Sequence, residues 1–193
     1  MRLCLIHPAF QKMEGWRKDS TQVVPDELWE CLQSYFHNLN WDNYLKSLDE
    51  EALPFTFVHG DFHPGNIMWI PDDPHCRVRF FDWEMVGLDY GPQELGQYVV
   101  SHMDMSKYGA EVHEQLVRAY YDEMVATNPD VSIACSWEAC FANFVNGGMR
   151  KWLWMLPLIS VWNMDISNYF IHQIDSFRKM HGVRSDEVCY PQI

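Results

Sequence analysis

The pattern of hydrophobic and polar positions predicts that most of this chain is helical. From Leu28 to Leu39, apolar residues recur at spacings of three and four, which is the period of one face of an α-helix. A proline followed by two acidic residues, at 25–27, is typical of a helix start. Residues 1–25 otherwise show no clear period. The pattern predicts further helices at 41–48, 93–103, 108–127, 136–155 and 161–181.

Two features bear on the predicted helix at 136–155. Gly147 and Gly148 are candidates to interrupt it, because glycine is a poor helix former. Pro157 is the candidate to end it, because proline lacks the N–H group that continues the helical hydrogen bonds. We therefore expect a helix boundary shortly before Pro157.

Three short runs rich in aromatic and β-branched residues predict strands, at 54–58, 67–70 and 77–81. The connector at 71–76 carries two prolines and two aspartates, so the second and third runs are expected to pair as an antiparallel hairpin. No strand is predicted after the third run, and residues 87–92 are expected to form a loop. The predicted order along the chain is a helix, then short strands, and then only helices. This order is typical of a mostly helical α+β fold.

Composition and charge narrow the class of protein. The 193 residues, of which 48% are hydrophobic, are enough for one domain with a sizeable core. The formal net charge of −13 argues against a nucleic-acid partner. The longest strongly apolar run without charge, 152–164, has 13 residues, whereas a membrane span needs about 20. The sequence does not predict the oligomeric state.

The compartment is predicted from the N-terminus and the cysteines. The apolar run near Met1 has four residues, which is too short for a signal-peptide core. The six cysteines are scattered and include no CxxC pair, so we expect mostly buried free thiols in a reducing compartment. These observations predict a cytoplasmic protein without a membrane partner.

The segment 58–69 carries the candidate chemistry. His59, Asp61 and Asn66 match the spacing H-x-D-x-x-x-x-N of a kinase catalytic loop. Asp82 follows sixteen residues after Asn66, directly after the third predicted strand. If the hairpin forms, the side chains of Asn66 and Asp82 come together, and such oxygen ligands suit Mg²⁺.

This arrangement predicts a role for each residue in phosphoryl transfer. Asp82 would bind Mg²⁺ on the phosphates of ATP, and Asn66 would complete the metal and nucleotide site. Asp61 would orient the acceptor hydroxyl and take its proton. His59 and His63 are expected to hold the loop by hydrogen bonds. Taken singly, Asp61, Asn66 and Asp82 are better explained as an ordinary turn residue, strand-entry residue and cap or loop acid. Their joint spacing, with the strands in place, favours the functional interpretation.

The run His59-Gly-Asp-Phe-His-Pro-Gly-Asn66, followed by Phe80-Phe-Asp-Trp83, resembles the aminoglycoside phosphotransferase and choline kinase group of the protein-kinase-like fold. The resemblance implies that Asp61 is the catalytic base and that Asn66 and Asp82 are the metal ligands. It also implies that Glu94, in the place of a family aspartate, supports the catalytic loop. Relatives phosphorylate diverse small hydroxyl compounds, some of them cationic, so the acceptor stays open.

The resemblance covers only the C-terminal lobe of that fold. The first 54 residues contain one glycine, Gly15, and no lysine that follows a strand pattern, so the N-terminal nucleotide lobe appears in no part of the sequence. The expected organisation is an N-terminal segment with helices (1–54), catalytic and metal loops with the hairpin (55–92) and a helical subdomain (93–193). We expect the isolated chain to bind ATP weakly and to turn over poorly.

Two alternative functions remain open at this point. The chain could be a truncated, catalytically weak or inactive homologue that acts as a binding module. It could also be a non-haem metal enzyme in which His59, Asp61 and His63 are the ligands, since two histidines and a carboxylate form a common ligand set. The aromatic residues around Trp152 could form a cage for a cationic acceptor, or simply pack in a core.

Overall fold

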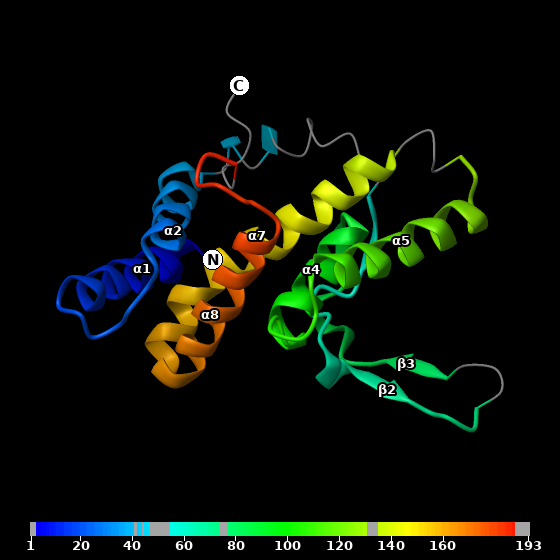
Figure 1. The fold of residues 1–193 in the computed structure, drawn as a ribbon, viewed down its shortest axis with the longest axis horizontal. Helices are drawn as coiled ribbons and strands as arrows, with labels where there is room; N and C mark the ends of the chain where they lie inside the picture. Colours follow the sequence, from blue (N-terminus) through cyan, green and yellow to red (C-terminus); the bar gives the residue numbers. More distant parts are fainter. Residues whose placement is uncertain are drawn as a thin grey trace. The chain divides into compact units, whose positions relative to one another are not determined.

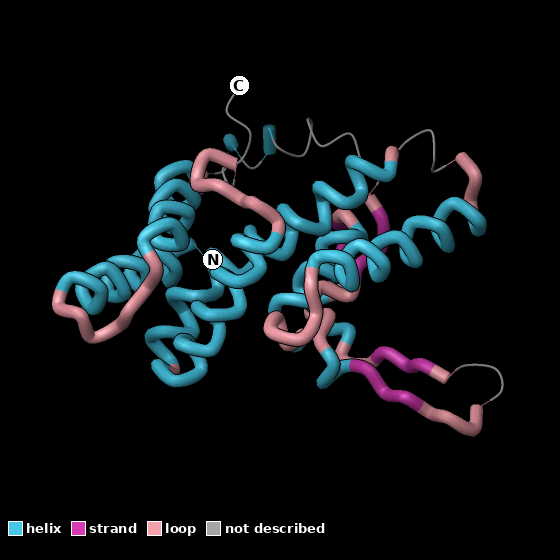
Figure 2. The backbone as a smooth tube through the Cα atoms, viewed as in Figure 1, coloured by secondary structure: helices cyan, strands magenta, loops and turns pink. Residues whose placement is uncertain are grey.

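The computed structural model describes residues 3–40, 42–43, 45–46, 55–73, 77–130 and 135–187. It is a mostly helical α+β structure with two small antiparallel sheets, as predicted (Figures 1 and 2). Its long helices are α1 (Leu3–Lys18), α2 (Asp26–Asn38), α4 (Gly91–His102), α5 (Ala110–Thr127), α7 (Trp137–Trp162) and α8 (Met164–Met180). No helix in the described ranges has the length and apolar character needed to cross a membrane.

The chain divides into two compact units, which are described separately. The first contains residues 1–52, 105–110 and 149–193, and the second contains residues 53–104 and 111–148. Helix α7 contributes its N-terminal half to the second unit and its C-terminal half to the first.

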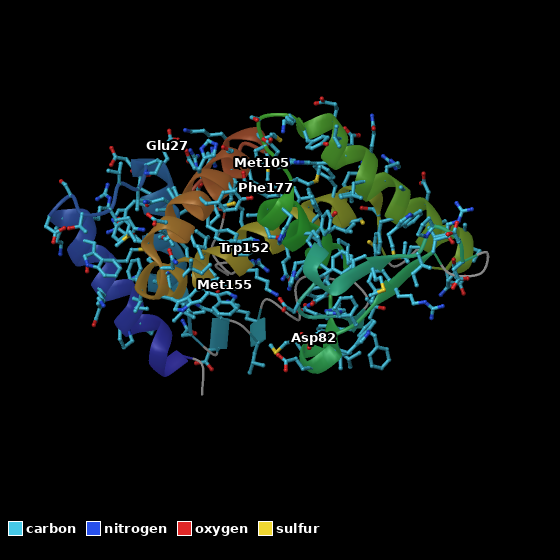
Figure 3. All side chains as sticks on the ribbon, turned by 90° about the horizontal axis from the view of Figure 1, so that it is seen from below. Glu27, Asp82, Met105, Trp152, Met155 and Phe177 are labelled. Carbon is cyan, nitrogen blue, oxygen red and sulfur yellow. The ribbon has the colours of Figure 1, made fainter. Side chains whose placement is uncertain are left out.

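In the first unit, helices bury the apolar face that the sequence predicts. Leu28, Cys31, Leu32, Tyr35 and Phe36 of α2 are buried, at the predicted spacings of three and four. Phe177 of α8 is completely buried, and Figure 3 labels it on this helix. Trp152 is also buried and stacks on Phe170, with 4.4 Å between ring centroids. This stacking is core packing, the simpler of the two interpretations of the aromatic region.

Helix α1 was not predicted, because residues 1–25 lack an obvious period. Its inward side is short: Ala9 and Met13 are buried one turn apart, and Phe10 stacks on Phe36 with 4.2 Å between ring centroids. Pro8 lies inside the helix and further weakens the local signal. Tertiary contacts with α2 therefore supply what the local pattern of α1 does not show.

The predicted boundary in α7 is wrong, because the helix continues through Gly147 and Pro157 to Trp162. A Cβ atom on Gly147 would lie 2.4 Å from a side-chain carbon of Gln93, so this glycine permits close packing against α4. Pro157 lies among buried neighbours, including Leu156. The free energy gained by packing at this turn is therefore larger than the cost of the backbone hydrogen bond that proline cannot make.

In the second unit, strand β2 (Ile67–Trp69) pairs antiparallel with β3 (Val78–Phe80), which confirms the predicted hairpin. Strand β1 (Thr56–Val58) pairs with β4 (Gly87–Asp89), so the predicted loop at 87–92 is wrong. Three residues are too few to show a strand period, and β4 exists because β1 lies beside it. Pro54, residues 74–76 and half of the predicted helix 41–48 lie outside the described residues.

The cysteines whose side chains the structure describes are Cys31, Cys135 and Cys140, and all three are buried free thiols, as expected. Burial raises the pKa of the Cys140 thiol to about 12. Such a thiol stays protonated at neutral pH and is a poor nucleophile.

Candidate active site

The candidate catalytic loop leaves β1 of one sheet after Val58 and enters β2 of the other sheet through a short 3-10 helix, η1 (Pro64–Asn66). Gly60 adopts a positive φ of 79°, and a Cβ atom there would lie 2.1 Å from the carbonyl oxygen of Met85. Only glycine fits this position without displacing the backbone. The glycine of the His-Gly-Asp run therefore sets the path of the loop.

Glu94, on the first turn of α4, holds the backbone of this loop. Its carboxylate accepts hydrogen bonds from the N–H groups of His59 (2.8 Å) and Gly60 (2.6 Å). Bonds from two backbone donors to one charged group are stronger than neutral ones. Glu94 thus makes the kind of contact expected of a loop-supporting residue, with glutamate in place of aspartate.

His59 ties the loop to the end of β3. Its Nε2–H donates to the carbonyl oxygen of Phe81 (2.8 Å), and its Nδ1 accepts from the N–H of Asp61 (3.3 Å). Both ring nitrogens therefore contact the backbone, which leaves neither for a metal. Within the described ranges, no group of three His, Cys, Asp or Glu residues is arranged to hold a metal ion. The alternative metal triad is not supported by this geometry.

Asp61 presents a half-exposed carboxylate with two side-chain neighbours. Its Oδ1 accepts a hydrogen bond from Nε2 of Gln97 (3.2 Å), and its Oδ2 lies 3.5 Å from Nε2 of His63. The other ring nitrogen of His63 accepts from the N–H of Gly65 (3.0 Å). This bond places the proton of a neutral His63 on Nε2, facing the carboxylate.

The ring of His63 also stacks on His102, with 5.7 Å between ring centroids and 12° between ring planes. Burial and the neighbouring charge of His63 lower the pKa of His102. The two rings therefore disfavour a double positive charge beside Asp61.

Asn66 and Asp82 lie at the two feet of the hairpin. The amide Nδ2 of Asn66 donates to the backbone oxygen of Asp61 (3.0 Å), so its Oδ1 is the atom that could bind a cation. The carbonyl of Asn66 accepts from the N–H of Phe81 (3.2 Å), the residue directly before Asp82. A carboxylate and an amide oxygen at neighbouring feet fit the donor set that Mg²⁺ prefers.

Asp82, which Figure 3 labels, is exposed and directly precedes a second 3-10 helix, η2 (Trp83–Met85). It adopts the left-handed conformation, with φ 63° and ψ 55°. For a residue other than glycine this backbone costs about 1 kcal/mol or more. A strained aspartate at a strand end is typical of a functional position, because stability alone would favour glycine there.

Gln97 and His102 contact the candidate loop but were not predicted from the sequence to belong to the site. Their only signal is their spacing from Glu94, three and eight residues along the same helix. That spacing puts them on the side of α4 that carries Glu94. Polar residues on one side of a helix can be assigned to a site only when the residues that they contact in the folded chain are known.

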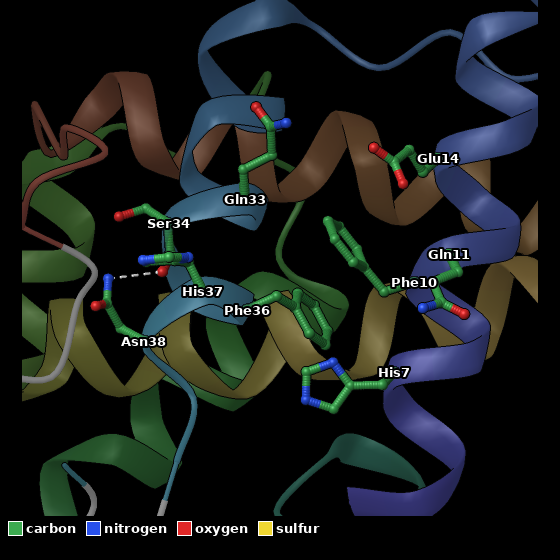
Figure 4. Close-up of a pocket in the computed structure, with 9 residues that line it drawn as sticks. All are labelled: His7, Phe10, Gln11, Glu14, Gln33, Ser34, Phe36, His37 and Asn38. Atoms are coloured by element: carbon green, nitrogen blue, oxygen red, sulfur yellow. Dashed lines mark hydrogen bonds between the residues drawn. The ribbon is translucent and has the colours of Figure 1, made fainter.

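A separate cavity of about 690 Å³ lies in the first unit, where α1 faces α2 (Figure 4). It is lined by His7, Phe10, Gln11, Glu14, Gln33, Ser34, Phe36, His37 and Asn38. None of these residues was predicted to belong to a site. The cavity walls are the stacked Phe10 and Phe36 and a mainly polar rim.

Comparison with known proteins assigns the family. The model of the phosphotransferase enzyme family matches residues 8–129, which is more than half of the chain and includes the whole candidate loop. The chain belongs to this phosphotransferase family. Phosphotransfer to a small molecule is the activity that the family indicates. This result confirms the resemblance seen in the His59-to-Asn66 run.

The chain is also similar over a short segment to a curated protein that is named as a different kind of enzyme. It is a 3-hydroxyanthranilate 3,4-dioxygenase of Aspergillus niger, 26% identical over 83 residues, which are 41% of this chain and 44% of that protein. The chain thus spans less than half the length of that relative. No solved structure matches the chain significantly.

Proposed function

We propose that this chain supports ATP-dependent transfer of phosphate to the hydroxyl group of a small molecule. In this proposal Asp61 is the base, and Asn66 and Asp82 hold Mg²⁺ with the nucleotide phosphates. His59, His63 and Glu94 keep the loop in place. The family supports the reaction class, and the residue roles rest on the local geometry.

The observation that carries the proposal is the pairing of the hairpin. The bond from Phe81 to Asn66 sets Asp82 next to Asn66, and the amide of Asn66 in turn holds the backbone of Asp61. One hydrogen bond thereby joins Asn66 to the candidate base, and the other joins Asn66 to Phe81, the neighbour of Asp82 in the chain. Mg²⁺, when bound there, would neutralise charge on the transferred phosphoryl group.

Asp61 can act as a base because its environment leaves part of the carboxylate accessible. The side chain is 44% exposed, and the side chains of Gln97 and His63 beside it are hydrogen-bond donors. Donors stabilise the ionised form that must accept a proton. Asp61 would therefore orient the acceptor hydroxyl and remove its proton as the oxygen attacks phosphorus.

Several exposed apolar side chains lie around the hairpin of the second unit. Met68, Trp69, Phe80, Phe81 and Trp83 are each more than two-fifths exposed around the hairpin. Large exposed apolar groups in one region mark a surface that another protein layer or a ligand covers. We propose that a second lobe covers it and encloses the nucleotide, while this chain supplies the C-terminal lobe.

The direct test is Mg²⁺-dependent nucleotide binding. We expect isothermal titration of the full chain with an ATP analogue to show weak binding that requires Mg²⁺ and is lost in Asp82→Ala. Asp72→Ala, which removes an exposed aspartate from the turn of the same hairpin, should bind like the wild type. Binding that persists unchanged in Asp82→Ala would overturn the assignment of the metal ligands.

A second candidate is a binding module without turnover. The described residues that precede β1 contain helices and no strand, so a nucleotide-binding sheet is not among them. Without cationic groups on the phosphates, a rate loss of about 10² or more is expected. Nucleotide binding without measurable transfer to choline, an aminoglycoside or a hexose would favour this candidate.

A further inference from the structure

Helix α4 contacts the candidate catalytic loop almost residue by residue. Glu94 holds the backbone at its start, at His59 and Gly60. One turn later, Tyr98 packs on Phe62, with 5.7 Å between ring centroids.

The contacts continue to the far end of the loop, where His102 stacks on His63. Residues 94, 98 and 102 are four apart, so they lie along one side of the helix. Residues 59–63 of the loop therefore contact α4 in the same order as their partners along the helix.

Gln97 is the partner of Asp61 in this series. It is 4% exposed, and its Nε2 donates to Oδ1 of Asp61 at 3.2 Å. The amide is neutral, so it can fix the carboxylate without the strong charge pairing that an arginine or lysine would bring. Oδ1 is thereby engaged by a buried donor, whereas the side chain as a whole stays 44% exposed.

We propose that Gln97 is a positioning residue for the candidate base: its hydrogen bond to Oδ1 holds the Asp61 carboxylate so that Oδ2 receives the proton of the acceptor hydroxyl. This inference rests on the proposed function. A half-exposed aspartate without such a partner would sample several side-chain rotamers. Because transfer requires a near-attack geometry, fixing one rotamer raises turnover without adding any contact to the nucleotide.

The role predicts a split between binding and turnover. Gln97→Met keeps the length of the side chain and removes the donor. We expect its Mg²⁺-dependent affinity for an ATP analogue to equal that of the wild type, and its transfer from labelled MgATP to water or choline to fall about tenfold, the effect of losing one hydrogen bond to a charged group. The matched control is Gln115→Met, which changes an exposed glutamine on α5 and should alter neither the affinity nor the rate of transfer.

A spectroscopic measurement tests the contact without relying on turnover. In ¹⁵N-labelled full chain, the side-chain amide signals of Gln97 are identified by their loss in Gln97→Met. We expect these signals to shift in Asp61→Asn, because the charged acceptor is replaced, and to stay unchanged in Asp72→Asn.

The two measurements separate the possible failures. Unchanged transfer in Gln97→Met, with transfer present in the wild type, would overturn the inference and leave the proposed function intact. The inference would also be overturned if the side-chain amide signals of Gln97 do not shift in Asp61→Asn. Absence of Mg²⁺-dependent nucleotide binding in the wild type, with Gln97 signals that respond, would overturn the proposed function while establishing the contact.

Discussion

The core of the first unit and the candidate loop of the second are held in different ways. In the core, helices fully bury apolar side chains such as Leu32, Leu153 and Phe177. The candidate loop is fixed by individual hydrogen bonds, of which those accepted by Glu94 and donated by the ring of His59 are the clearest. Packing tolerates exchange among apolar residues of similar size, whereas each of these hydrogen bonds depends on one particular side chain.

This difference separates stability from function. Removing a core side chain from the first unit should lower stability and leave the chemistry of folded molecules intact. Removing a polar side chain from the loop should do the opposite, because the loop is half-exposed and contributes little apolar burial. Four predictions test this contrast, in order of decreasing effect.

The largest effect is expected for Asp61→Asn. The amide keeps the shape of the side chain but cannot accept a proton, so transfer from labelled MgATP should fall by about 10²- to 10⁴-fold. Thermal unfolding should change little, because the residue is not part of the core. Asp72→Asn is the control, and equal transfer in both variants would contradict the assignment of Asp61 as base.

Phe177→Ala should cause the largest loss of stability. Emptying this completely buried position of α8 should lower the free energy of unfolding by about 3–5 kcal/mol, measured by urea titration. Tyr169→Ala, at a position on the same helix that is 47% exposed, should change it by less than about 0.5 kcal/mol. Similar losses in the two variants would show that the first unit has no such core.

Glu94→Gln should have an intermediate effect on transfer. The amide can still accept a hydrogen bond but carries no charge, so the hydrogen bonds from the N–H groups of His59 and Gly60 weaken. Loss of charge from such a bond predicts transfer about 10- to 100-fold slower. The matched control is Glu123→Gln, an exposed position on α5. If both variants transfer phosphate at the wild-type rate, Glu94 does not support the loop.

The smallest effect concerns pH. Burial lowers the pKa of His113, and Glu111 opposes this effect in part. Because the folded state binds this proton less readily than the unfolded state, the contribution to stability is complete above about pH 6.5 and declines as the pH falls below that value. His113→Gln should therefore show a flatter stability curve between about pH 7.5 and 5.5.

The matched variant for the pH prediction is His172→Gln, which changes an exposed histidine on α8. Its curve should follow that of the wild type. Parallel curves for the wild type and His113→Gln would contradict the prediction.

The elements that could be predicted are those whose signal is local. Helix α2 has a strong three-and-four period, and the β2–β3 hairpin has two short apolar runs around a proline-rich turn. The spacing of His59, Asp61 and Asn66 likewise needs only the sequence, because neighbouring residues of one loop share one place in the fold. The same locality explains why the family could be recognised from this segment.

Other features depend on partners far along the chain. Strand β4 exists because β1 lies beside it, and α7 continues past its glycines and proline because packing outweighs local propensity. Gln97 meets Asp61 across 36 residues, and no pattern in the sequence predicts that pairing.

The sequence by itself determined which residues carry the candidate chemistry, since side-chain type and short spacing are properties of the chain. Only the tertiary structure decided how those residues are held, because the hydrogen bonds accepted by Glu94 and donated by Gln97 and Phe81 join segments that meet only after folding. The strength of such a bond depends on distance and direction in space, which the linear order of residues does not contain.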